Sequence, residues 1–163
     1  MKFGKTILAL SLFFVASTTP QAREPYRTNC DAGCITPSQA ILLAAQGADF
    51  KPQKGVSGVF ELMIQATGAS RMREFLNSET DYRDQRNLTI ALDPEVVDAL
   101  KKEHGVNPAI YFKGKTIRVD GIASRIRIDF TSNRQATGKY YYQTHVRVKD
   151  PNQITVVALS TAP

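Results

Sequence analysis

The residues best suited to chemistry lie in one polar stretch, LNSETDYRDQRNLTI, which occupies positions 76–90 between two apolar segments. The stretch holds three carboxylates, Glu79, Asp81 and Asp84. Paired carboxylates can divide the roles of general acid and general base, and with amide oxygens they can bind a hard cation. One hypothesis is therefore a small hydrolase or nuclease that works through these three acids.

The same stretch also has the composition of a loop that stabilises itself. Asparagine, serine and aspartate side chains hydrogen-bond to nearby backbone in turns, and Arg83 and Arg86 can neutralise the neighbouring acids. We favour this interpretation over catalysis or metal binding and predict a loop between two strands. The residues with a structural or ligand-contacting role are then Asn77, Ser78, Asp81, Tyr82, Arg83 and Asn87.

A second set of candidate residues lies at positions 124–149, in the basic and aromatic segment SRIRIDFTSNRQATGKYYYQTHVRVK. We expect two strands joined by a turn, with arginine, tyrosine and histidine on one open face. Such a face can contact a phosphate backbone through its arginines and stack bases on its rings. The alternative is a hairpin whose solvent-exposed face carries charges without binding a ligand. The candidate ligand-binding residues are Arg118, Arg125, Arg127, Tyr141, His145 and Arg147.

The chain has two cysteines, Cys30 and Cys34, four positions apart. We expect a local disulfide rather than free thiols or a zinc site, because a metal would need further ligands and the chain has only two histidines, His104 and His145. A redox pair usually has the spacing C-x-x-C, which this is not. The sequence also lacks G-x-S-x-G, H-E-x-x-H and a phosphate-cradling glycine loop. We therefore expect no enzymatic activity, no cofactor and no metal.

The first 22 residues have the layout of a secretory signal peptide. Lys2 and Lys5 precede an apolar run at positions 7–16, and small and polar residues follow. The run is well short of the ~20 residues that span a bilayer as a helix. We expect cleavage between Ser17 and Ala22 and export to the periplasm or the medium. Removal of residues 1–22 leaves 141 residues and lowers the formal net charge from +6 to +4, which suits one mildly basic domain.

Two helices are predicted from their end signals. Thr36 and Gln39 form a capping box with a proline between them, and Gly47 offers a stop. Asp93 precedes a second proline-initiated helix whose last turn is basic and which ends at Gly105. The first helix belongs to an N-terminal extension, residues 23–57, and the second lies within the main domain.

Strands are predicted from alternating apolar residues at positions 59–67, 71–76, 87–92, 114–130 and 139–149. In the fourth of these, we expect Ile122, Ile126, Ile128 and Phe130 to face inward after a bend at Gly121. Three strands, one helix and two strands is the element order of the OB-fold, a five-stranded Greek-key barrel. The predicted fold is therefore mainly β, with a barrel domain at residues 58–158 and a tail at residues 159–163.

Three segments resemble the corresponding sequences of small exported bacterial OB-fold proteins. They are YFKGKTIRVDG, VKDPNQITVV and LNSETDYRDQRNLTI. The resemblance implies the barrel but no reaction. The segment at positions 122–148 looks longer than the turn expected there. We predict a monomeric, non-enzymatic binding module for a polyanion, either nucleic acid or glycan. The alternatives are the hydrolase above and an envelope scaffold whose exposed strand pairs with a partner protein.

Overall fold

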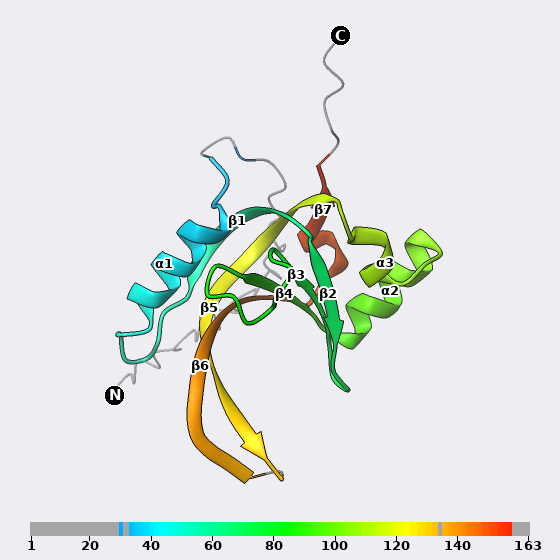
Figure 1. Ribbon diagram of the computed structural model, residues 1–163. Helices are drawn as coiled ribbons and strands as arrows, with labels where there is room; N and C mark the ends of the chain where they lie inside the picture. The colour runs from blue at the N-terminus through cyan, green and yellow to red at the C-terminus, as the bar shows by residue number, and fades with distance from the viewer. Residues whose placement is uncertain (1–29, 31–32, 134, 158–163) are drawn as a thin grey trace, which may run out of the picture.

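The computed structural model describes residues 30, 33–133 and 135–157 (Figure 1). The predicted signal peptide and the predicted tail at residues 159–163 lie outside this part. The helices are α1 (Pro37–Gly47), α2 (Pro94–His104), α3 (Pro108–Phe112) and the short 3-10 helix η1 (Pro151–Gln153). The strands are β1 (Val56–Met63), β2 (Ala66–Ala69), β3 (Glu74–Asn77), β4 (Leu88–Leu92), β5 (Thr116–Ser132), β6 (Gln135–Val148) and β7 (Ile154–Val156).

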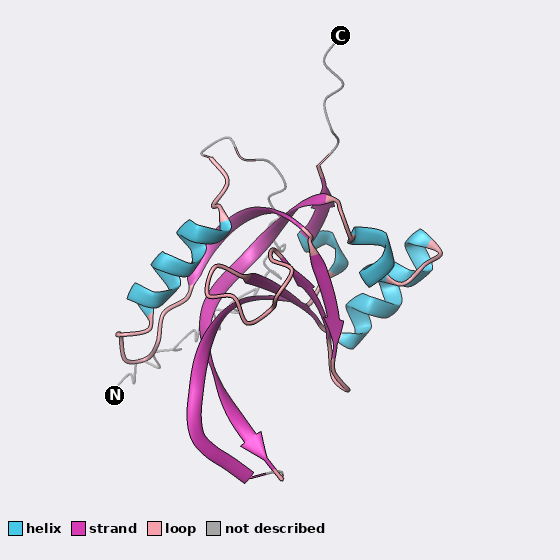
Figure 2. Cartoon of the chain, viewed as in Figure 1, coloured by secondary structure: helices cyan, strands magenta, loops and turns pink. Residues whose placement is uncertain are grey.

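All the described strands belong to one curled sheet with the order β1-β5-β6-β4-β3-β2, and β7 pairs with β5 (Figure 2). Every pair is antiparallel except β4 with β6, which is parallel. A mainly β, curled sheet with few helices confirms the predicted class and is consistent with an OB-like fold. The predicted count of five strands was wrong, because the structure has seven.

One of the two extra strands arises where the chain changes partners, and the other is β7. β1 and β2 stand at opposite ends of the strand order but are separated only by Ile64 and Gln65. The Ile64 amide donates to the Lys115 carbonyl at 2.9 Å, and the next amide, that of Gln65, donates to the Asn77 carbonyl at 2.9 Å. Successive residues thus bond to different strands, which breaks one predicted strand into β1 and β2 and curls the sheet.

The core fills the inside of the curled sheet. Its largest fully buried side chains include Phe60, Leu76, Ile90 and Val146, and Val96 of α2 packs into the same cluster. Alternate residues of the strands supply it, as the period of two requires. Among the described residues no helix is long and apolar enough to cross a membrane.

The helix predictions are confirmed with two differences. The α1 capping box forms, with the Thr36 amide donating to Gln39 Oε1 at 2.9 Å. α2 starts after Asp93 and ends at Gly105, which has the left-handed φ of 73° that glycine accepts readily. The Asp93 side chain, however, makes no capping hydrogen bond, and α3 is a second helix between β4 and β5 where one was predicted.

The predicted inward face of β5 is wrong beyond Gly121. Ile117 and Val119 are fully buried as expected, but Ile122 is 56% exposed and Phe130 is 44% exposed. Alternation continues through Gly121, so Ala123 is the buried residue instead. The remainder of β5 pairs with β6 in a hairpin that projects past the rest of the sheet, at the bottom of Figure 1.

A disulfide joins Cys30 and Cys34, as predicted, with the two Cα atoms 4.9 Å apart. It lies beside β1, because the Cys34 Sγ is 3.6 Å from Glu61 Oε2. In the part of the chain that is described, these three residues are also the only group of His, Cys, Asp and Glu side chains close enough to share an ion. The disulfide occupies both sulfurs, so this group is structural.

Candidate ligand-binding groove

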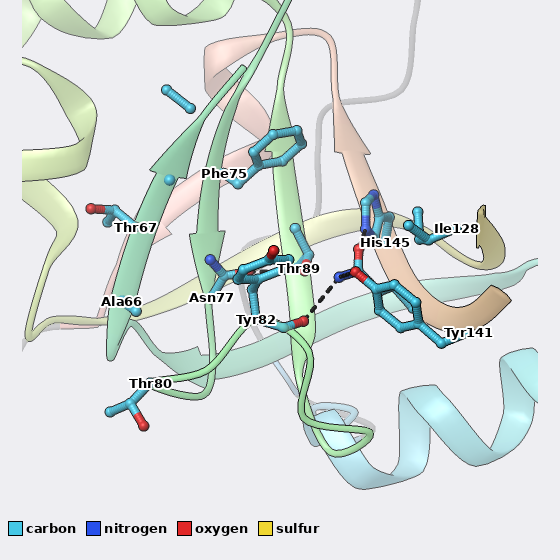
Figure 3. Close-up of a pocket in the computed structure, with 13 residues that line it drawn as sticks. Ala66, Thr67, Phe75, Asn77, Thr80, Tyr82, Thr89, Ile128, Tyr141 and His145 are labelled. Carbon is cyan, nitrogen blue, oxygen red and sulfur yellow. Dashed lines mark hydrogen bonds between the residues drawn. The ribbon is translucent and has the colours of Figure 1, made fainter. Parts of the chain in front are cut away.

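A groove of about 450 Å³ lies on the outer side of the curled sheet (Figure 3). One wall comes from β2 and β3, the floor from β4, and the other wall from β5 and β6. The loop at residues 78–87 closes one side through Thr80 and Tyr82. The groove therefore unites segments that are far apart in the sequence. Its ring-bearing residues are Phe75, Tyr82, Tyr141 and His145.

The strand period explains why these side chains meet. In β3, Leu76 points into the core while Phe75 and Asn77 point outward into the groove. In β6, Val146 is buried, and Gln143 and His145 occupy the opposite face. Outward residues of neighbouring strands lie side by side in a sheet, so the curled sheet with an apolar interior has a polar and aromatic outer surface here.

Gln143 is the hub of the groove's hydrogen bonds. Its Nε2 donates to the Tyr82 carbonyl at 2.9 Å and to the Tyr141 hydroxyl at 3.1 Å (Figure 3). Its Oε1 lies 2.7 Å from His145 Nε2, and because an amide oxygen only accepts, that ring nitrogen carries the proton. The loop and the hairpin are thus tied together across the groove.

His145 is held neutral at physiological pH. Burial, and then the positive charge of Arg73, lower the pKa of its imidazole to about 4. The ring also lies 6.1 Å from that of Phe75, centroid to centroid. No residue that lines the groove in the described chain carries a lysine, arginine, aspartate or glutamate side chain. The groove is therefore an uncharged surface of rings, hydroxyls and amides.

Polar residues of the loop and of the strands beside it form a buried hydrogen-bonded network. Asn87 Nδ2 donates to Asn77 Oδ1 at 3.1 Å and to Thr89 Oγ1 at 2.9 Å. Thr89 Oγ1 in turn donates to Asn77 Oδ1 at 2.9 Å, and the Leu88 amide donates to Ser78 Oγ at 2.8 Å. These contacts agree with the loop interpretation of residues 76–90, in which these side chains bond to each other and to nearby backbone.

Two of the three acids of the loop accept hydrogen bonds in its turns. Asp81 Oδ1 accepts from the Arg83 amide at 2.9 Å, and Asp84 Oδ1 accepts from the Arg86 amide at 2.8 Å. Arg86 also pairs with Asp84 through its guanidinium at 2.7 Å, which lowers the pKa of that carboxyl to about 2. Among the described residues, these carboxylates and Glu79 do not approach closely enough to share an ion. Asp81 and Asp84 therefore bond within the loop's own turns.

The structure divides the predicted basic and aromatic face between the two sides of the hairpin. Arg125 stacks on Tyr142, with 3.8 Å from Cζ to ring centroid, and Arg127 stacks on Tyr140 at 4.1 Å. Tyr141 and His145 point to the other side, into the groove. Alternation along β6 requires this split, so Arg125 and Arg127 do not meet Tyr141 and His145 on one face.

The other two predicted arginines are held in ion pairs. Arg118 Nε donates to Glu61 Oε2 at 2.7 Å, near the disulfide. Arg147 Nε donates to Asp93 Oδ1 at 2.8 Å, and Arg73 Nε donates to the same oxygen at 2.9 Å. The two arginines lower the pKa of Asp93, and they explain why this carboxylate does not cap α2.

Sequence reasoning missed three features of the groove. Phe75 and Thr67 line it, and Asp93 anchors two arginines beside it. The pattern Phe75–Leu76–Asn77 contains the signal for the first, because alternation places an aromatic and an amide on the face opposite a core leucine. No local signal marks the other two, since their partners are distant in sequence.

No protein-family model and no curated protein matches the chain. Among solved structures, it is similar to one described as an aspartyl-tRNA synthetase from Leishmania major Friedlin, with 13% identity and a TM-score of 0.40 over 92% of this chain. A second is an aspartyl-tRNA synthetase from Entamoeba histolytica, with 14% identity and a TM-score of 0.35 over 93% of this chain. The chain spans about a quarter of the length of either protein, 24% and 25%. Scores this low establish no common fold. The fold class therefore rests on the sheet topology described above, a curled, OB-like sheet with an outer groove.

Proposed function

We propose that the chain is a non-enzymatic OB-like binding module. In this view the strand order β1-β5-β6-β4-β3-β2 follows that of an OB barrel whose first strand is bent and divided into β1 and β2, and β7 is an addition. The parallel pairing of β4 with β6 supports this reading, because the third and fifth strands of such a barrel meet in that way. OB-folds bind oligonucleotides and oligosaccharides on their outer strand face, where the groove lies.

We infer that the ligand is an oligosaccharide. The observation that carries this is the lining of the groove, which combines rings with hydroxyl and amide groups and has no formal charge at pH 7. Sugar rings present apolar faces to aromatic side chains and hydroxyls to polar groups. A pocket with a few convergent polar groups among apolar ones is the usual form of a small-ligand site.

Single-stranded nucleic acid is the second candidate, and Arg83 is the observation that favours it. Its guanidinium lies 4.9 Å from the centre of the Tyr82 ring at the mouth of the groove. A base stacked on tyrosine could then have its phosphate near this cation. Each phosphate contact with a single strand adds about −0.7 to the slope of log affinity against log salt concentration, so binding weakens as salt rises. A neutral glycan should bind with almost no salt dependence.

The groove is tested by two adjacent tyrosines that lie on opposite faces of β6. Tyr141→Ala removes a ring from the groove, and Tyr142→Ala removes one from the other face. We expect Tyr141→Ala to weaken binding about 5- to 150-fold, taking the about 1–3 kcal/mol that a base stacked on an aromatic ring contributes. We expect Tyr142→Ala to leave binding unchanged. Arrays of neutral oligosaccharides and oligonucleotides would identify a ligand. Calorimetry at two salt concentrations would then measure the affinity of each variant for that ligand.

Equal effects of the two substitutions would place the binding site elsewhere. A steep salt dependence with oligonucleotides would replace the glycan by nucleic acid in the same groove. Failure of every oligomer to bind, with the protein folded, would leave the envelope scaffold as the better proposal.

We also propose that the protein is exported and acts without turning over its ligand. Export is supported by the signal-like residues 1–22 and agrees with the Cys30–Cys34 disulfide. The hydrogen bonds of Asp81 and Asp84 to amides of their own turns support binding over hydrolysis. Cell fractionation with N-terminal sequencing of the mature chain tests the first point. Mass spectrometry of each bound oligomer after long incubation tests the second, and cleaved product would contradict it.

A further inference from the structure

The far part of the β5–β6 hairpin has a free backbone edge. β1 pairs with β5 only up to Ala123, and in the described chain residues 124–132 of β5 pair with β6 alone. The ribbon views show the end of the hairpin projecting past the other strands (Figures 1 and 2). Two-stranded ribbons are marginally stable on their own, and a free edge is a template for another strand.

Two hydrogen bonds identify which residues face that edge. Gln53, which precedes β1, donates from Nε2 to the Arg125 carbonyl at 2.8 Å, so this carbonyl points to the free side. Thr137 of β6 donates from Oγ1 to the Phe130 carbonyl at 2.9 Å, so that carbonyl points to the paired side. Because the backbone groups of successive residues alternate between edges, Arg127 and Asp129 direct their N–H and C=O groups to the free edge.

The side chains along this edge are complementary to themselves. Within one copy Arg127 pairs with Asp129, with Nη2 2.8 Å from Oδ1, and a second copy can share this pair. If two copies of the segment run antiparallel about a two-fold axis at Ile128, Arg127 of each copy lies opposite Asp129 of the other. Ile126 then faces Phe130, and both side chains are exposed in the single chain, 37% and 44%. Opposite charges and apolar pairs directly across a ladder are stabilising. Edge charges of one sign would instead prevent self-pairing.

We propose that two copies of the chain associate through this edge, with residues 126–130 of β5 paired antiparallel to the same residues of the second copy. The dimer is isologous, as most homodimers are, and replaces the monomer expected from the sequence. The regular β5–β6 register breaks between Asp129 and Thr131, which limits the contact to these few residues. The association is therefore weak and depends on concentration.

The proposal does not depend on the identity of the ligand, but it has a consequence for the groove. Ile128 lines the groove and lies on the proposed two-fold axis. An axis perpendicular to the paired strands brings the same face of each copy to the same side, so the two grooves adjoin. A ligand that contacts both would be held by two equivalent sites.

A charge swap tests the interface by sedimentation between about 10 µM and 1 mM protein, the range in which a weak dimer dissociates. Arg127→Asp or Asp129→Arg alone places like charges opposite each other twice per dimer. We expect each to raise the dissociation constant about tenfold or more. The double variant, Arg127→Asp with Asp129→Arg, restores both pairs and should restore the dimer. Arg71→Asp and Asp98→Arg change the net charge equally at exposed positions elsewhere and should have no effect.

A cysteine at the axis tests the register. In Ile128→Cys the new thiols of two copies face each other in a non-hydrogen-bonded pair, whose Cα atoms are about 4.5 Å apart, within reach of a disulfide. We expect it to cross-link on mild oxidation much faster than Ile122→Cys, an exposed control on the same strand. A wild-type monomer at all concentrations would overturn the proposal. A folded charge-swap variant that stays monomeric, or equal cross-linking of the two cysteine variants, would overturn it as well.

Discussion

Asn87→Ala should destabilise the protein far more than the other substitutions in its loop. The Asn87 amide donates to Asn77 Oδ1 and Thr89 Oγ1, and its Oδ1 accepts from the Glu79 amide at 3.1 Å. The residue is only 2% exposed, so water cannot replace these partners. These are the three shortest of the five hydrogen bonds that the Asn87 side chain makes. At about 1 kcal/mol each they give an expected loss of about 3 kcal/mol in the free energy of unfolding.

Asp81→Ala is the matched control because it removes a polar side chain from the same loop. Asp81 is exposed, and its side chain accepts one hydrogen bond, from the Arg83 amide. We expect a loss of about 0.5 kcal/mol, in the usual range for surface substitutions. Neither change touches the core, so both variants should keep the far-ultraviolet circular dichroism of the parent.

The assay is urea denaturation of the mature chain, with the free energy of unfolding taken by linear extrapolation at pH 7. The informative quantity is the difference between the two variants, about 2.5 kcal/mol, because effects on the unfolded chain largely cancel. If Asn87→Ala loses less than about 1 kcal/mol, the network does not hold the loop. Equal losses in both variants would mean that the hydrogen bonds of buried Asn87 stabilise the fold no more than the hydrogen bond of exposed Asp81.

Other predictions follow from single groups. The pKa of His145 falls from 6.5 to about 4 on folding, so between these pH values the unfolded chain binds more protons than the folded chain. The free energy of unfolding should therefore drop by at most about 3 kcal/mol as the pH falls from 6.5 to 4. His145→Gln should flatten this pH dependence. Asp93→Ala leaves Arg73 and Arg147 without their shared partner and should cost about 2–3 kcal/mol, measured by urea titration; a loss no larger than that of Arg147→Ala would contradict this. Thr36→Ala removes a helix cap and should cost about 1 kcal/mol, seen as a lower melting temperature; an unchanged melting temperature would contradict the capping role.

Local chemistry is the part of this fold that could be predicted. The caps of α1 and the stop of α2 depend on residues within a few positions of each other, and the structure has them where the sequence placed them. The same holds for residues 76–90, since amides and hydroxyls that bond to neighbours need no distant partner. The candidate groove was not predictable in this way. Its walls meet only because pairing between strands distant in sequence places β6, β4, β3 and β2 side by side in one curled sheet.

The error over the hairpin has a definite physical cause. Arginine, tyrosine and histidine were grouped by composition, but side chains alternate across a strand, so Tyr141 and Tyr142 face opposite sides. Register between β5 and β6 decides which arginine meets which ring, and it is set by the turn and the β-bulge near Phe130 rather than by local sequence. The break into β1 and β2 likewise depends on hydrogen bonds to residues about 12 and 50 positions away.

The length of the far β5–β6 hairpin can change during evolution without a change in the core of the domain. The core residues of β5 end at Ala123 and those of β6 begin again at Val146. Insertions or deletions between them would alter the reach of one groove wall without a change in the packed interior. Variation of this kind is tolerated where no core contact is lost. A lineage could thus lengthen or shorten the arm to suit a new ligand while it keeps the same folding unit.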